Sequence, residues 1–307
     1  MIISASRRTD IPAFYGDWLI QRLRQGYVLV RNPFNPLQVS RVSLDPQVVD
    51  CIVFWTKNPG PLLEKLPEIE RLGYRFVVQF TLNAYDRALE QHVPPLHERL
   101  RTFCQLADRI GPDRVLWRFD PILFTRSHGP DAVLRTFARL AGQLRASTRQ
   151  CTISFLSLYI KCRRNMNDID LLVPADEEKR RLVHQLSAVA GENGIHLKAC
   201  CDPFLHETCG IEAGRCIDAE LIADITGFPL TIPKDKGQRP GCGCAVSVDI
   251  GAYDTCPQGC RYCYANVSQN RVAAKREEHD PMGPLLIGTL DGRERITERM
   301  SQSWRKV

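Results

Sequence analysis

The sequence predicts an α/β protein built around a mainly parallel sheet. Apolar runs of strand length alternate with amphipathic stretches of helical length along the chain, which is 307 residues long. Such alternation is typical of right-handed βαβ units. Polar residues follow several of the predicted strands, as they do where parallel strands end beside a ligand. Five or six such units form either an open doubly wound sheet or a full or partial barrel, and the pattern alone does not choose between them.

The first predicted helix has residues typical of helix ends at both boundaries. Asp10 is a good N-cap, Pro12 fits the first turn, and Gly26 is a typical stop. A later helix carries a regular apolar stripe through Val133, Phe137 and Leu144. In order, strands are predicted at 1–6, 28–30, 49–55, 75–82, 114–119, 151–156, 195–199 and 245–250, and helices at 10–26, 61–72, 95–110, 130–146, 176–193 and 269–278. The last thirty residues are expected to form loops and one short helix.

The predicted units divide the chain unequally. Residues 1–230 hold the repeated βα units. The loop 233–243 is rich in Gly, Pro and Lys, which favours a break in regular structure. Residues 231–307 are expected to add a final strand, a cysteine-rich loop and a helix that complete the same domain.

The composition indicates a cytoplasmic protein. The chain is 44% hydrophobic and 25% charged, and no apolar run approaches the ~18 residues of a membrane span. The apolar run at the N-terminus is too short for a signal peptide. A net charge of +6 permits an anionic partner without requiring one. Thirteen cysteines in a cytoplasmic chain favour metal binding or catalysis over disulfides.

Three cysteines near the C-terminus have the spacing C-x-x-x-C-x-x-C. They are Cys256, Cys260 and Cys263, and the aromatic residues Tyr262 and Tyr264 flank the last of them. Three thiolates on one loop suit a [4Fe–4S] cluster and leave one iron open for another ligand. A structural zinc site is the alternative, but it usually needs a second C-x-x-C or an H-x-x-x-H, and the sequence has neither.

A second group of cysteines precedes this motif. Cys242 and Cys244 have glycines beside them, which let a backbone fold tightly around a metal. Cys216, with Cys200 or Cys201, would complete four ligands, and Cys201 is the residue we assign. The group suits an auxiliary iron–sulfur cluster or a structural zinc. The alternative is that these cysteines are simply small buried apolar residues.

The predicted strand ends supply charged candidates for a catalytic site. Arginine and lysine bind carboxylates and phosphates, and aspartate binds an ammonium group. For Arg118 and Asp120 the alternative is a structural pair with each other. The candidate catalytic residues are Arg7, Arg8, Asp10, Lys57, Arg118 and Asp120.

The cysteine spacing resembles the signature of the radical S-adenosylmethionine (SAM) superfamily. Four longer stretches, 6–12, 54–59, 117–121 and 234–266, are similar to a bacterial family of uncharacterised proteins with a C-terminal cysteine motif of this kind. The resemblance implies a TIM-like barrel, complete or partial. It also implies a permuted chain, because in radical SAM enzymes the motif usually follows the first strand.

The resemblance further implies a function and its cofactors. The chain is expected to be an enzyme that cleaves SAM reductively with a [4Fe–4S] cluster and abstracts hydrogen from a small molecule, peptide or nucleic acid. Cys256, Cys260, Cys263 and Tyr262 would bind the cofactors, and a flavodoxin or ferredoxin would supply electrons. Two alternatives remain: a non-catalytic, metal-stabilised nucleic-acid-binding protein, and an iron–sulfur protein for electron transfer or redox sensing.

Overall fold

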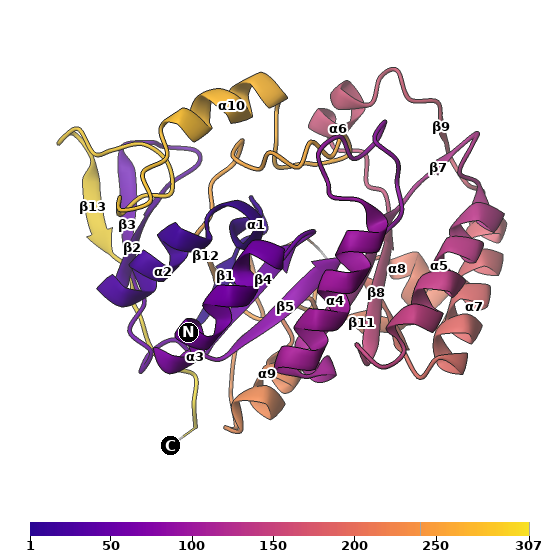
Figure 1. Ribbon diagram of the computed structural model, residues 1–307, viewed down its shortest axis with the longest axis horizontal. Coiled ribbons are helices and arrows are strands. Elements are labelled where there is room, and N and C mark those ends of the chain that lie inside the picture. The colour runs from indigo at the N-terminus through magenta and orange to yellow at the C-terminus, as the bar shows by residue number, and fades with distance from the viewer. Residues whose placement is uncertain (240, 307) are drawn as a thin grey trace.

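The computed structural model describes residues 1–239 and 241–306, and it shows an α/β fold (Figure 1). Pro240, within one of the stretches similar to the bacterial family, and Val307 lie outside the described residues. Eight strands form one sheet in the order β11-β10-β8-β6-β5-β4-β1-β12, and every pairing in it is parallel. The strands are β1 (Ile2–Ala5), β4 (Cys51–Thr56), β5 (Phe76–Thr81), β6 (Val115–Ile122), β8 (Gln150–Phe155), β10 (His196–Cys200), β11 (Glu212–Gly214) and β12 (Val248–Asp249).

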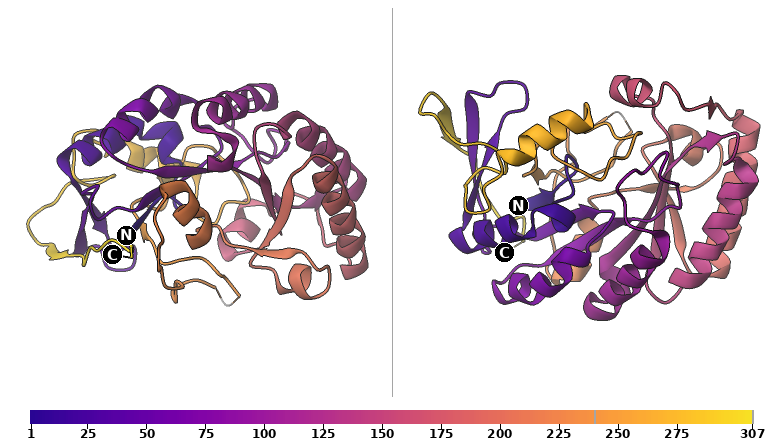
Figure 2. Two further views of the ribbon diagram at one scale, coloured as in Figure 1. Left: turned by 90° about the horizontal axis from the view of Figure 1, so that it is seen from below. Right: turned by 45° about the horizontal axis from the view of Figure 1, so that its top comes forward.

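The longest helices cover one face of this sheet (Figure 2). In α5 the predicted apolar stripe is confirmed, because Val133, Phe137 and Leu144 are all buried. The helices are α1 (Ile11–Phe14), α2 (Gly16–Gln25), α3 (Leu66–Arg71), α4 (Leu96–Ile110), α5 (Pro130–Leu144), α6 (Ile160–Asn165), α7 (Asp176–Glu192), α8 (Pro203–Glu207), α9 (Ala219–Thr226) and α10 (Gln269–Glu277). No helix in the described part of the chain is long and apolar enough to cross a membrane.

The last strand of the sheet lies beside the first, as predicted. Ile3 pairs with Val248 and Ser4 with Asp249. The strand is shorter than the predicted 245–250, because the Ala245 N–H donates to the Ile217 carbonyl at 2.9 Å instead of to β1. That bond connects the segments next to the two edge strands, β11 and β12.

Two predicted helices differ from the structure for local reasons. The first helix is broken at Tyr15, which has a non-helical φ of −131° and separates α1 from α2. The segment 61–72 is a 3-10 helix, Gly60–Lys65, followed by α3. Pro67 stands in the first turn of α3, where its missing N–H is tolerated, and it cannot continue an α-helix from the preceding turn.

The C-terminal prediction was wrong. Among residues 278–306 the structure shows no helix and instead forms the strand β13 (Arg295–Glu298). This strand pairs in parallel with β3 (Gln38–Ser43), which pairs antiparallel with β2 (Tyr27–Arg31). A further two-stranded sheet consists of β7 (Phe124–Thr125) and β9 (Leu171–Leu172).

Trp117 of β6 anchors the core between the sheet and α5. Its side chain is fully buried, and its indole ring stacks on Phe137 with ring centroids 4.9 Å apart. Its Nε1–H donates to the Leu82 carbonyl at 2.8 Å, so burial leaves no polar atom of the ring unsatisfied.

We expect Trp117→Ala to lower the free energy of unfolding by about 3–5 kcal/mol, because the substitution leaves a large cavity and an unpaired carbonyl. Urea denaturation followed by circular dichroism measures the change. Phe34→Ala is the control, since Phe34 is 94% exposed and its removal should change stability by less than about 0.5 kcal/mol. Equal effects of the two substitutions would contradict this account of the core.

Gly251 lets the chain leave β12 against the end of β1. A Cβ at this position would overlap the Ser6 hydroxyl and lie 2.6 Å from the Ser6 Cβ. We expect Gly251→Ala to destabilise the protein by about 1–3 kcal/mol through this overlap. Gly191→Ala is the matched control, because nothing lies within 4 Å of a Cβ there and alanine favours the helix. A thermal unfolding midpoint for Gly251→Ala at or above that of Gly191→Ala would exclude the close contact.

Candidate functional site

The predicted cysteine motif lies in the loop between β12 and α10, between α10 and α6 in Figure 1. We call residues 251–268 the cysteine loop. Its start is fixed by Asp249, whose carboxylate accepts hydrogen bonds from Ser4 Oγ at 2.9 Å, Ser6 Oγ at 2.6 Å and Arg7 N at 2.8 Å. One carboxylate therefore holds the segment after β1 against the segment after β12.

Asp10 holds the far side of the same loop. Its carboxylate accepts from Gln258 Nε2 at 3.0 Å, Lys57 N at 2.9 Å and Ala13 N at 3.1 Å. Burial raises the pKa of Asp10, and these hydrogen bonds oppose the rise. The predicted proximity of residues 7–10 to the cysteine loop is confirmed. Both carboxylate oxygens of Asp10 already accept hydrogen bonds from the protein. Asp10 therefore positions the loop and does not bind a ligand's ammonium group.

The three thiols of the motif are half-buried and lie close enough to influence one another. Burial raises the pKa of Cys256, Cys260 and Cys263, and neighbouring thiols further raise the pKa of Cys256 and Cys260. The charge of Lys57 opposes the rise at Cys260 and Cys263. Such thiols become thiolates when a metal supplies positive charge.

The three cysteines of the motif are of the ligand type that a cubic iron–sulfur cluster takes. In the described ranges, no group of three or more His, Cys, Asp and Glu side chains is arranged to hold one metal ion. A cubic cluster does not need that convergence, because each thiolate binds a different iron. Cys256, Cys260 and Cys263, half-buried on one loop, supply the thiols that three of the four irons require.

A buried polar group lies beside Cys260. Lys57 Nζ lies 2.8 Å from Glu90 Oε1 and 3.3 Å from Asn83 Oδ1, and the Tyr262 hydroxyl donates to the same Glu90 oxygen. Burial raises the pKa of Tyr262, so its hydroxyl remains a donor. The backbones of Glu90 and Cys260 form a β-bridge. Lys57 and Tyr262 therefore support the loop through Glu90.

Sequence reasoning missed Glu90. It lies in the long segment between β5 and α4, away from any strand end. No sequence motif marks it, and its position depends on the path of that segment over the cysteine loop. Glu278, Glu277 and other carboxylates carry the same local signal, so charge alone could not have selected it.

The two N-terminal arginines lie on aromatic rings. The Arg7 guanidinium lies 5.0 Å from the Trp55 ring centroid, and Arg8 lies 5.2 Å from that of Tyr253. Arg8 Nε is also 3.9 Å from Asp249 Oδ1. Arg7 Nη2 is buried and has no hydrogen-bond partner. Of the two, Arg7 has the unused donor that a carboxylate or phosphate would accept.

The second cysteine group also comes together, with one difference from the assignment. Cys200, the other candidate beside the assigned Cys201, lies next to Cys216, with the two sulfurs 3.2 Å apart. The Cys244 thiol also donates to Cys216, and Arg118 Nη1 lies 2.9 Å from the Cys216 sulfur. These contacts, the two thiols first, lower the pKa of Cys216, while the bond to Cys216 raises that of Cys200.

Cys242 and Cys201 lie close to this thiol group. They belong to the same apolar cluster as Cys216 and Cys244. Burial raises the pKa of Cys201, and the charge of Cys242 raises it further. The predicted four-sulfur set is thus found as a contacting trio, Cys200, Cys216 and Cys244, with the other two cysteines nearby.

Arg118 and Asp120 form the structural pair that was the alternative for them. Arg118 Nε donates to Asp120 Oδ1 at 3.1 Å, and Nη2 pairs with the other carboxylate oxygen. Burial opposes the charge of Arg118, but Asp120 and the thiols raise its pKa well above the usual value. The guanidinium lies 5.3 Å from the Trp55 ring centroid, so Arg7 and Arg118 both form cation–π contacts with Trp55.

Several buried polar atoms around the cysteine loop have no hydrogen-bond partner. Buried polar groups are normally paired with protein, water or a ligand. A polar ligand bound at the cysteine loop would supply hydrogen-bond partners for these atoms. The atoms are Arg7 Nη2, Thr9 Oγ1, Gln258 Oε1 and Asn266 Oδ1.

Comparison with known proteins places the chain in a family. No curated protein matches the sequence. Residues 2–265, which include all the strands of the main sheet and the three cysteines of the motif, match the model of the family described as "Domain of unknown function (DUF1848)". The chain therefore belongs to the DUF1848 family.

Proposed function

We propose that this protein is a radical SAM enzyme whose cluster ligands are Cys256, Cys260 and Cys263. The observation that carries the proposal is the placement of three half-buried thiols on one loop beside Arg7, Lys57 and Glu90. A simple electron-transfer protein would need a fourth thiolate for its cluster and would have no use for unpaired polar atoms beside it. The arrangement therefore favours an enzyme that binds a ligand at this loop.

The chain's own residues would bind and shelter the reactants. The bound cluster and SAM would supply reductive cleavage of SAM and hydrogen abstraction from the substrate. The unused Nη2 of Arg7 would bind a carboxylate, and Asp249 would fix its backbone. Tyr264 adds to this, because its hydroxyl donates to the Arg7 carbonyl at 2.8 Å. A cytoplasmic flavodoxin or ferredoxin would donate the electron.

We further propose that the sheet is a permuted barrel with its seam between β11 and β12. The pairing of β12 with β1 supports the permutation, because it moves the cysteine loop to the first strand's side. The bond from Ala245 N to Ile217 O supports closure, since it connects the two edges. In such a barrel both cysteine groups would open toward the interior.

A second metal is the remaining part of the proposal. Cys200, Cys216 and Cys244 contact one another, and Cys242 and Cys201 lie in the same cluster. An auxiliary iron–sulfur cluster or a zinc would accept several of these thiols as thiolates. The Arg118 guanidinium beside Cys216 would balance part of the added negative charge.

Changing Cys256, Cys260 and Cys263 together to Ala should abolish SAM cleavage. The protein would be reconstituted anaerobically, reduced with dithionite and given SAM, and 5′-deoxyadenosine would be measured. The triple variant should also lose the SAM-dependent change in the electron paramagnetic resonance signal, because the iron that binds SAM is gone. Cys104→Ala, in α4, is the control and should keep both signals. Unsubstituted protein that holds zinc and no iron would refute the proposal.

Metal analysis tests the second site separately. We expect either about eight irons per chain, which means two clusters, or about four irons and one zinc. Cys216→Ala should remove the second metal and leave about four irons on the cysteine loop, because Cys216 is the center of the thiol trio. Four irons and no zinc in the unsubstituted protein would show that the second group is apolar packing.

A further inference from the structure

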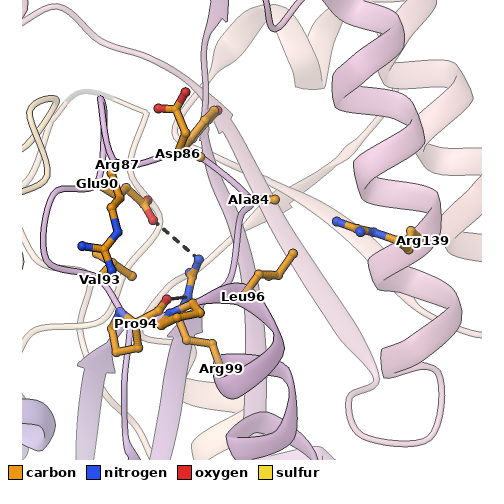
Figure 3. A pocket seen from close by; sticks show the side chains of 11 residues that line it. Ala84, Asp86, Arg87, Glu90, Val93, Pro94, Leu96, Arg99 and Arg139 are labelled. Atoms are coloured by element: carbon orange, nitrogen blue, oxygen red, sulfur yellow. Dashed lines mark hydrogen bonds and ion pairs between the residues drawn. The ribbon is translucent and has the colours of Figure 1, made fainter.

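A cavity of about 300 Å³ lies on the outer side of the segment that covers the cysteine loop (Figure 3). It is bounded by residues 84–87 and 93–96, by the first turn of α4, and by Arg139 of α5. Neither the cluster ligands nor Arg7 line it. It is therefore distinct from the site proposed for SAM.

Arg99 is the central residue of this cavity. It is only 2% exposed, and its Nε and Nη2 donate to the carbonyls of Pro94 at 2.9 Å and Asn83 at 3.0 Å. Its Nη1 is buried without a partner. A guanidinium that lacks an acceptor for one amine indicates a missing anionic oxygen.

Glu90 faces Arg99 with a carboxylate oxygen that accepts no hydrogen bond. Its Oε2 is buried without a hydrogen-bond partner and lies 3.7 Å from Arg99 Nη2, which is too long for a hydrogen bond. An acidic oxygen of this kind needs a hydrogen-bond donor. Figure 3 shows the Arg99 guanidinium directed toward Glu90.

The rest of the wall carries two arginines and one carboxylate, that of Asp86. The helix α4 begins at Leu96, and its N-cap Pro95 provides no side-chain cap, so the positive end of the helix dipole stays open. The exposed Arg87 and Arg139 also line the cavity, and neither forms an ion pair within the described residues. In Figure 3, Arg139 reaches toward the cavity from across it.

We propose that this cavity binds a protonated phosphate group, either free hydrogen phosphate or the phosphoryl group of a small metabolite. Its oxygens accept from Arg99 Nη1 and the start of α4, and its P–OH donates to Glu90 Oε2. Sulfate offers the same acceptors but carries no proton at neutral pH, so it would leave Glu90 facing an oxyanion. The chemistry of the pair therefore selects phosphate over sulfate.

The side chain of Glu90 would separate a bound phosphate from the proposed active site. The other oxygen of Glu90 binds Lys57 Nζ at 2.8 Å and accepts from the Tyr262 hydroxyl. Phosphate at Arg99 would change the electrostatic surroundings of Glu90, and through it those of Lys57 and Cys260. This inference does not depend on the identity of the cluster or its reaction.

Isothermal titration calorimetry of the full chain with inorganic phosphate, glycerol phosphate and sulfate tests the proposal at about pH 6, where about half of the glycerol phosphate carries the required proton. Phosphate or glycerol phosphate should bind at least about tenfold more tightly than sulfate, because one charged hydrogen bond is lost with sulfate. The stronger of the two phosphates identifies the source. Equal binding of phosphate and sulfate, or no binding of either phosphate below about 10 mM, would overturn the proposal.

Two substitutions place the binding in this cavity. Arg99→Gln should weaken phosphate binding at least about tenfold. Because Arg99 also supports two carbonyls, Arg139→Gln provides a test on an exposed residue and should weaken binding a few-fold through lost charge. Arg135→Gln, one turn away on α5 and outside the cavity, is the matched control and should bind as the unsubstituted chain does. The same affinity in the Arg139 and Arg135 variants would place the phosphate elsewhere and refute the assignment.

Discussion

The parallel pairing of β12 with β1 is the constraint on which the candidate site depends. Asp249 makes this pairing specific, because it accepts from Ser4, Ser6 and Arg7, residues about 245 positions away along the chain. A half-buried carboxylate that accepts several hydrogen bonds holds its donors in one geometry. The cysteine loop starts two residues later, at Gly251, so its place over the sheet follows from the same bonds.

Positive charge is distributed through the site in a way that balances the thiols. The guanidiniums of Arg7 and Arg118 lie 5.0 and 5.3 Å from the Trp55 ring centroid. Arg118 contacts the Cys216 sulfur, and the charge of Arg7 acts on Cys244 and Tyr264. Electrostatic interactions are strong where water is excluded, so thiolates at either group would gain from these cations. The second cysteine group thus has Arg7 and Arg118 as compensating charges, while Lys57 acts on Cys260 and Cys263 of the motif.

The sequence predicts the parts of the structure that have a strong local signal. The apolar runs of β4 and β5 and the stripe of α5 require no knowledge of the rest of the fold. The contact between Cys200 and Cys216 has no such local signal, because a shift of one residue at the end of β10 reverses the direction of the side chain. Glu90 and β13 depend on where a loop and a terminal segment meet distant strands, and composition carries no information about that meeting.

Glu90 shows how one buried side chain connects three parts of the protein. A carboxylate that is 2% exposed is costly to bury unless cations and hydrogen-bond donors surround it. Lys57 and Tyr262 satisfy one of its oxygens, and Arg99 faces the other at 3.7 Å. The first two belong to the proposed active site, while Arg99 belongs to α4 and the outer cavity. Hydrogen bonds to one oxygen of Glu90 change the negative charge on its other oxygen. The cysteine loop and the outer cavity are therefore electrostatically coupled through this residue, without any movement of the sheet between them.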